Sequence, residues 1–227
     1  MLDCAGDVTP SAAVNEPSLV DVGPTEGALG ACLVWRFDRP LLAISSSIVG
    51  GGIGEVSWVL NLTVDRDYSR LDPAEHLGEV AARLRLDGRG IGLMTAVDVG
   101  TWTSAACEQA GVVATVGVTR PVWAADPHRP PASVHPLPGT INLVAFVPVR
   151  MSEAALVNSI ATVTEAKVQA LAAHEVPGTG TASDALCVLC PTGGESEMFG
   201  GPRSTWGGRL AVATFDAVAA GIIRQRG

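Results

Sequence analysis

Apolar runs and one clear helix signal organise the first half of the chain. Strands are expected over residues 32–37, 40–45, 56–64 and 91–99. The turn residues Asp38-Arg39-Pro40 predict that the first two strands form a hairpin. A helix is expected to begin at Asp72-Pro73-Ala74-Glu75, which combines an N-cap residue, a proline at the first helical position and an early glutamate, and to end near Leu86.

The second half of the chain repeats this alternation of strands and helices. The pattern predicts strands over 111–118, 141–149 and 185–190, and helices over 152–174 and 207–223. A proline-rich connection over 121–138, with His128 and His135, is expected to be a long loop. Because a strand, a helix and a strand follow one another in both halves, the sequence suggests an internal strand–helix–strand pseudo-repeat.

This order of elements predicts an α/β fold, with α+β as the alternative, built as a single layered domain with a mixed sheet and helices. Residues 1–30 are rich in Pro, Gly, Ser and acidic residues and show no sustained periodicity. We expect them to be a loosely ordered N-terminal segment before one domain over residues 31–227. With 227 residues, of which 47% are hydrophobic, the chain is long enough to bury a sizeable core.

Composition and charge limit the classes of partner that we expect this protein to bind. A formal net charge of −8 and scattered basic residues argue against nucleic acid, which needs clustered Lys and Arg. No continuous apolar run reaches the roughly 18–20 residues of a membrane span, and no signal peptide is recognisable. We therefore expect a cytoplasmic protein without nucleic-acid or membrane partners, and the oligomeric state stays open. Five dispersed cysteines do not suggest a disulfide framework, so reduced thiols are expected.

Lys167 stands out in the helix expected over 152–174. At about 100° per residue it lies on the apolar stripe, with Thr164 at the edge of the stripe and Glu165 on the opposite side. A lysine on an apolar stripe must find a carboxylate or carbonyl partner, extend its ammonium to solvent, or lose its proton. A core ion pair and a functional role are both open for Lys167, whereas Glu165 is expected to be a surface residue.

The run Gly178-Thr179-Gly180-Thr181-Ala182-Ser183-Asp184 is the strongest candidate site, because it joins two glycines, three hydroxyls and a carboxylate. Glycines leave backbone N–H groups free to face an oxyanion, and a carboxylate can activate water. The structural alternative is a helix-to-strand turn whose polar side chains satisfy their own backbone. The run is not a dinucleotide-binding fingerprint, since it leads from a helix to a strand.

Metal chemistry has little support in the sequence. Cys187 and Cys190 form a single CxxC pair within an apolar strand, where structural thiols are favoured over a metal site. The four histidines show no metal-ligand spacing, and no Gly-x-Ser-x-Gly elbow is present. We therefore expect no protein-bound metal.

Four motifs in order give the chain a family resemblance: Gly139-Thr140-Ile141-Asn142, Thr164-Glu165-Ala166-Lys167, Gly178 to Ala185, and Gly200 to Gly208. Together with Ser45-Ser46, Gly50-Gly51-Gly52 and Gly92 to Ala96, this series resembles the adenosylcobinamide amidohydrolase family from about Trp35 to the C-terminus. The chain departs from the family pattern at Ser183, where Thr is common, at Phe199, where Tyr is usual, and over Arg203 to Trp206.

The resemblance implies hydrolysis of the amide that joins a corrin propionyl group to aminopropanol in adenosylcobinamide. The products would be adenosylcobyric acid and 1-aminopropan-2-ol, in corrinoid salvage, with no cofactor beyond the cobalt of the substrate. The residues implied in catalysis are Asp184, Lys167, Glu165, Thr181 and Ser183. Those implied in binding the corrinoid are Ser46, Gly51, Gly52, Thr95, Thr140, Asn142, Thr164, Gly178, Thr179 and Gly180. A non-catalytic corrinoid carrier or sensor, and an amidase for another amide metabolite, are the alternatives.

Overall fold

The computed structural model describes residues 16–23, 27–126 and 139–227. Its elements are β1 (Ser18–Asp21), β2 (Ala28–Ser45), β3 (Gly52–Val64), α1 (Pro73–Arg83), β4 (Gly90–Thr95), the 3₁₀ turn η1 (Val99–Thr101), β5 (Thr103–Cys107), β6 (Ala110–Val116), β7 (Ile141–Phe146), α2 (Glu153–Ala173), β8 (Ala185–Pro191) and α3 (Thr205–Arg226). The eight described strands form one mixed sheet in the order β4-β3-β2-β8-β7-β6-β5, with β1 paired to β2. The predicted α/β fold with a mixed sheet is confirmed.

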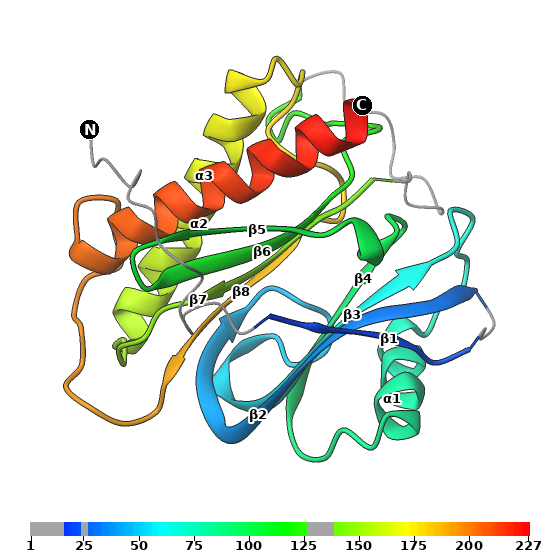
Figure 1. The fold of residues 1–227 in the computed structure, drawn as a ribbon, viewed down its shortest axis with the longest axis horizontal. Coiled ribbons are helices and arrows are strands. Elements are labelled where there is room, and N and C mark those ends of the chain that lie inside the picture. The colour runs from blue at the N-terminus through cyan, green and yellow to red at the C-terminus, as the bar shows by residue number, and fades with distance from the viewer. Residues whose placement is uncertain (1–15, 24–26, 127–138) are drawn as a thin grey trace.

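The sheet is bent so that two halves face each other (Figure 1). Helices α2 and α3 pack side by side over β5 to β8, and α1 lies beside β3 and β4 (Figure 1). Apolar side chains between the halves, such as Leu33, Leu93 and Val144, form one core cluster, and separate clusters lie beneath the helices. The ends of β3 and β4 therefore come close to the starts of β7 and β8, although these segments are far apart in the sequence.

The predicted strand–helix–strand repetition is present in the topology. Strands β3 and β4 are parallel and joined through α1, and strands β7 and β8 are parallel and joined through α2. The preceding strand is antiparallel to the first strand of each unit, β2 beside β3 and β6 beside β7. Both units therefore have the same order, and β2 joins them by pairing with β8.

The hairpin expected at Asp38-Arg39-Pro40 is wrong, because β2 continues through these residues as one strand. The pairing with β3 shifts between Arg36, opposite Trp58, and Leu41, opposite Val56, so the extra residues form an irregularity. A proline is tolerated there because the hydrogen-bond ladder is interrupted. Beyond the shift, β2 also pairs with β8, and this long-range pairing overrides the local turn signal.

Other boundaries differ in smaller ways from the sequence prediction. Strand β1 lies in the segment expected to be loosely ordered, α1 ends at Arg83 rather than Leu86, and β5 was not predicted. The strand expected to reach residue 99 ends at Thr95, because Asp98 caps a 3₁₀ turn by accepting a hydrogen bond from the Gly100 N–H (2.9 Å). The loop expected over 121–138, with its two histidines, lies largely outside the described residues.

Helix α3 also meets the length and hydropathy of a membrane span, which the search for continuous apolar runs missed. Over an 18-residue window its mean hydropathy is 1.2, because Gly, Ala and Thr alternate with the larger apolar residues. In the structure 61% of that window is buried. Its apolar side chains, including Leu210, Val218 and Ile222, belong to the core cluster of the α2/α3 face.

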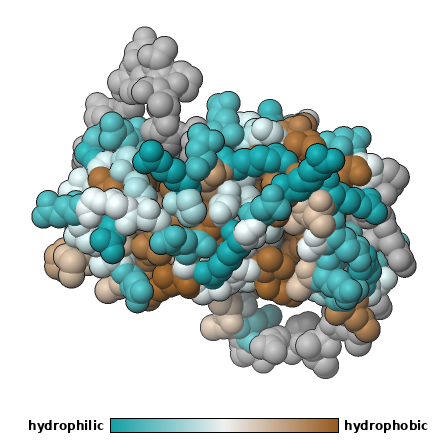
Figure 2. Space-filling view, turned by 90° about the horizontal axis from the view of Figure 1, so that it is seen from below, coloured by the Kyte–Doolittle hydropathy of each residue, from teal (hydrophilic) through white to brown (hydrophobic). Residues whose placement is uncertain are grey.

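Surface hydrophobicity is interrupted rather than continuous on the face seen in Figure 2. There, brown apolar areas are separated by white and teal side chains (Figure 2). The exposed aliphatic residues Ile48 and Leu71 line a cavity.

Candidate active site

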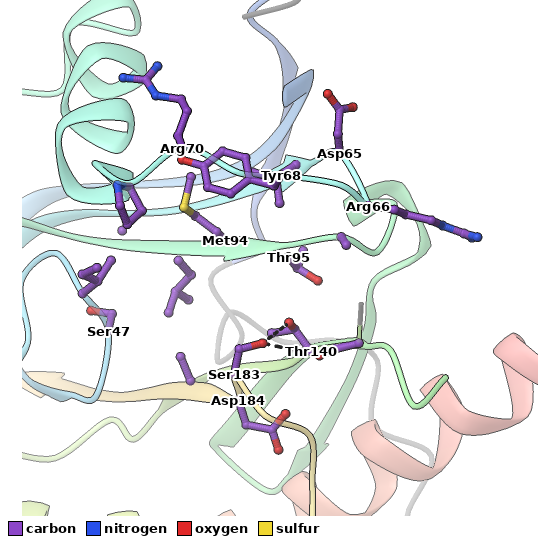
Figure 3. Close-up of a pocket in the computed structure, with 18 of the residues that line it drawn as sticks. Ser47, Asp65, Arg66, Tyr68, Arg70, Met94, Thr95, Thr140, Ser183 and Asp184 are labelled. Carbon is purple, nitrogen blue, oxygen red and sulfur yellow. Dashed lines mark hydrogen bonds between the residues drawn. The ribbon is translucent and has the colours of Figure 1, made fainter. Parts of the chain in front are cut away.

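A cavity of about 470 Å³ lies where the two halves of the sheet meet. Its walls come from five segments, around residues 46–48, 64–73, 92–96, 139–140 and 183–185. They lie after β2, at the end of β3 and in the loop that follows it, in β4 and just after it, and at or before the starts of β7 and β8. The bend of the sheet therefore gathers them from both of the strand–helix–strand units (Figure 3).

Three of the hydroxyl groups that line this cavity come from segments far apart in the sequence. Thr140, before β7, and Ser183, before β8, share a hydrogen bond of 2.7 Å between their Oγ1 and Oγ atoms. Thr95, at the end of β4, projects toward this pair (Figure 3). Its Oγ1 accepts a hydrogen bond from the Val97 N–H (3.1 Å). Since a hydroxyl also carries one proton, Thr95 can still donate to a bound ligand.

Lys167 and Asp184 form a buried ion pair. The Nζ of Lys167 lies 2.5 Å from Oδ2 of Asp184, and the exposed fractions of the two side chains are 8% and 15%. The helical pattern left three outcomes open for this lysine, and the structure shows the first of them, a carboxylate partner 17 residues away in the loop before β8. Gly180 leaves room for the pair, because a Cβ there would lie 2.4 Å from Oδ2 of Asp184.

Asp184 accepts hydrogen bonds at every position its carboxylate offers. Oδ1 accepts from the Ile141 N–H (2.9 Å) and from the Thr181 hydroxyl (2.5 Å), and Oδ2 accepts from the Thr181 N–H (3.1 Å) in addition to Lys167. An ionised carboxylate has about four acceptor sites. Asp184 therefore joins the start of β7, the loop before β8 and helix α2, and has no free lone pair with which to take a proton from water.

Several residues singled out from the sequence lie away from the cavity walls. Glu165 is exposed on α2, as its place on the helical wheel predicts, and the Thr164 hydroxyl donates to the Ile160 carbonyl of the same helix (2.8 Å). The run 178–180 pairs with the segment at Val122: the Thr179 N–H donates to the Val122 carbonyl (2.9 Å), and the Val122 N–H donates to Gly180 (2.8 Å). The backbone of this run is therefore hydrogen-bonded to a segment more than 50 residues earlier in the chain.

The glycine loop and Asn142 support the cavity from behind. Ser46 lines the cavity but also ties β2 to β8, because its Oγ accepts from the Leu186 N–H (3.1 Å). The carbonyl of Gly51 accepts from Arg89 (3.3 Å), and Gly52 follows at the start of β3. Asn142 is buried and donates from Nδ2 to Asn61 Oδ1 and to the Met94 carbonyl (2.9 Å each), which links β7 to β3 and β4.

The comparison with known proteins assigns this architecture to a family. Residues 23–227 match the family described as adenosylcobinamide amidohydrolase. The chain belongs to the adenosylcobinamide amidohydrolase family. It is 30% identical over 162 residues to an adenosylcobinamide amidohydrolase of Methanosarcina mazei, covering 71% of this chain and 74% of the relative. It is 36% identical over 123 residues to one of Halobacterium salinarum, covering 52% of this chain and about half (52%) of that relative.

The fold also has a distant likeness to a solved protein structure from Pyrococcus horikoshii OT3. The identity is 12% and the TM-score 0.46, over 92% of this chain and 82% of the other. A likeness at this level carries no argument about the site.

The motifs of the amidohydrolase family separate into two places in the structure. Gly139 to Asn142 and Ser183 to Ala185 lie at or behind the cavity. Gly200 to Gly208 follows the opposite end of β8 and packs on α2, since a Cβ at Gly200 would lie 2.1 Å from the Ala155 carbonyl oxygen. The divergent Arg203 to Trp206 and the exposed Phe199 belong to this second place, so they do not line the cavity.

Sequence reasoning missed one wall of the cavity, the segment 64–73. Tyr68 lines the cavity, and its hydroxyl lies 3.1 Å from Nδ1 of the buried His76. Burial lowers the pKa of His76, with Arg70 adding to the effect, so the neutral ring is favoured. This segment carried no motif. Its one signal is that Tyr68 is the single tyrosine of the chain.

The expectation of reduced, structural thiols holds for some of the cysteines but not for all. Cys32, Cys187 and Cys190 are free and buried, but Cys107 is disulfide-bonded, which contradicts the expectation for that residue. Cys187 and Cys190 belong to different core clusters on opposite faces of β8. No group of three or more His, Cys, Asp or Glu side chains placed to hold a metal occurs among the described residues.

We expect the Cys187 and Cys190 thiols to resist alkylation in the native protein. Burial raises the pKa of both thiols, and only the thiolate reacts quickly with iodoacetamide. Mass spectrometry of tryptic peptides should find them alkylated only after unfolding in denaturant. Rapid labelling of Cys187 without denaturant would show that β8 opens in the native state.

Proposed function

We propose that this protein hydrolyses the aminopropanol amide of adenosylcobinamide, giving adenosylcobyric acid and 1-aminopropan-2-ol. Membership of the amidohydrolase family and the names of two relatives support the substrate. The observation that carries the proposal is the convergence of Thr95, Thr140 and Ser183 on one cavity. The reaction would return a salvaged corrinoid to cobamide synthesis in the cytoplasm, with no resident metal or cofactor.

The cavity has the chemistry that a neutral amide requires. Water adds to the carbonyl carbon, and the carbonyl oxygen becomes an oxyanion. The proton that the water loses is carried to the amide nitrogen as the C–N bond breaks, which leaves a carboxylic acid and a free amine. Hydroxyl donors that face the developing oxyanion stabilise it. Thr95 keeps its proton available for this purpose, while the Thr140–Ser183 pair can orient the attacking water. Asp184 and Lys167 hold the loops that present these hydroxyls.

Only part of a corrinoid fits the cavity. A volume of about 470 Å³ lies within the range of sites for drug-sized ligands, and a corrin macrocycle with its adenosyl group and amide arms is considerably larger. The proposal therefore places the aminopropanol arm inside the cavity and the ring outside its mouth.

The direct test is product formation. Purified protein is incubated with adenosylcobinamide, with and without a chelator, and the mixture is analysed by liquid chromatography and mass spectrometry. We expect adenosylcobyric acid and 1-aminopropan-2-ol in equal amounts, with the rate unchanged by the chelator. Recovery of intact, tightly bound adenosylcobinamide would favour a carrier or sensor instead. Cleavage only of other amides, including complete cobamides, would favour a different amidase.

Replacing Ser183 with Ala should lower kcat/KM for adenosylcobinamide by about 10²-fold, the loss typical when one polar group is removed from a preorganised site. Ser183 is exposed, so the fold should be retained, which far-UV circular dichroism can check. Ser183→Thr is the matched control, because it keeps the hydroxyl and should preserve most of the activity. Equal activity of the Ala and wild-type proteins would remove Ser183 from the chemistry.

A further inference from the structure

The mouth of the cavity carries two exposed aliphatic side chains. Ile48, in the loop after β2, is 61% exposed, and Leu71, between β3 and α1, is 91% exposed. Both line the cavity, although they belong to separate segments. A single exposed leucine is ordinary on a protein surface. Two exposed aliphatic side chains at one mouth suggest an apolar surface that a ligand covers.

The segment that carries Leu71 is fixed to the rest of the protein. The Arg70 guanidinium donates to both carboxylate oxygens of Asp72 (2.9 and 2.8 Å) and to Glu79 of α1 (3.2 Å). Three residues before Leu71, the ring of Tyr68 stacks on that of His76. In Figure 3 the Arg70 side chain points away from the cavity, toward α1. These contacts hold the backbone on both sides of Leu71, so the exposed side chain is presented in a defined place.

A preorganised apolar surface lowers the entropy cost of binding a rigid ligand. The proposed substrate has such a part, since its macrocycle is flat and largely apolar and is too large to enter the cavity with the amide arm. When the arm is inside, the ring has to lie across the mouth, where Ile48 and Leu71 stand. Asp65 and Arg66 also line the cavity and can meet the polar amides at the edge of the ring.

We propose that Ile48 and Leu71 form a seat for the face of the corrin macrocycle, and that this seat selects ring-bearing amides over small ones. The inference rests on the proposed function, because it assigns the place of that substrate. The seat contacts the part of the substrate that does not react. It should therefore contribute equally to binding the ground state and the transition state, and affect KM rather than kcat.

The test uses the double variant Ile48→Ser/Leu71→Ser in the full-length protein. We expect KM for adenosylcobinamide to rise about tenfold with kcat changed less than about twofold, since each side chain loses part of the transfer free energy of a buried aliphatic group. Val157→Ser is the matched control: Val157 is also an exposed aliphatic residue (56%), but it lies near the start of α2, which follows the far end of β7. Its KM should equal that of the wild-type protein.

A spectrophotometric titration with adenosylcobinamide separates the seat from the reaction. Weaker binding to the double variant than to the wild-type protein, in the absence of turnover by either, would retain the seat and overturn the proposed hydrolysis. Normal hydrolysis with an unchanged KM in the double variant would retain the function and overturn the seat. A wild-type protein that neither binds nor hydrolyses the corrinoid would overturn both. An equal rise in KM in Val157→Ser would also contradict the seat.

Discussion

Asp184→Asn is expected to lower the free energy of unfolding by about 3–5 kcal/mol, the cost of breaking a buried ion pair by removing one partner. The substitution leaves the Lys167 ammonium, 8% exposed, without a carboxylate. It also turns an acceptor into an NH₂ donor, which must then face Lys167, Thr181 or the Ile141 N–H. Urea unfolding followed by circular dichroism measures the change.

A double-mutant cycle identifies the cause of this loss. In Lys167→Met/Asp184→Asn no charge is left buried, so the double variant should be more stable than Asp184→Asn alone, with a coupling of about 1–3 kcal/mol. If Asp184→Asn unfolds at the same urea concentration as the wild-type protein, the ion pair does not hold the loops together.

The activity of Asp184→Asn shows whether the role of Asp184 is structural or catalytic. Four donors already occupy the carboxylate of Asp184. We therefore expect turnover per folded molecule to fall only to the extent that the substitution displaces the hydroxyl groups of Thr140 and Ser183. Assays at low temperature, where the variant is mostly folded, should show activity that tracks the folded fraction. A total loss of turnover in a fully folded variant would instead make Asp184 the general base that activates water.

The strand–helix–strand units could be predicted because buried parallel strands have continuous apolar runs. Every residue of β7 is buried, and its pattern is clear in the sequence. The continuity of β2 could not be predicted, because Asp38-Arg39-Pro40 is a strong local turn signal. What overrides it is pairing with β3 on one side and with β8 on the other, and β8 lies far away in the sequence.

The sequence could predict a feature of the candidate site only where a single helix or strand determines that feature. The position of Lys167 on the apolar stripe follows from a single helix, but the pattern did not decide between a partner, exposure to solvent and loss of the proton. The meeting of Thr95, Thr140 and Ser183 depends on the bend of the sheet, which no periodicity encodes. Composition drew attention to Gly178-Thr179-Gly180, but glycines and hydroxyls serve turns as readily as sites, and here they pair with the segment at Val122.

Gly50→Ala, in the glycine loop after β2, should lower the free energy of unfolding by about 3 kcal/mol. Gly50 has φ +74°, a left-handed conformation that strains an alanine. A Cβ there would also lie 2.1 Å from the Gly90 carbonyl oxygen at the start of β4. The backbone of the loop must move to relieve this contact, and the loop carries Ser46, Ser47 and Ile48 of the cavity wall.

Gly52→Ala separates the two causes within the same loop. Gly52 has φ +84°, but a Cβ there would meet nothing within 4 Å, so only the backbone strain of about 1–2 kcal/mol applies. The free energies of unfolding of the two variants, measured by thermal and urea unfolding, should differ by the cost of placing a Cβ at residue 50 against the start of β4. Since only Gly50→Ala displaces the wall, it alone should raise KM for adenosylcobinamide. Equal stabilities and equal KM values would mean that the loop yields without disturbing the cavity, and that its glycines serve the turn and not the site.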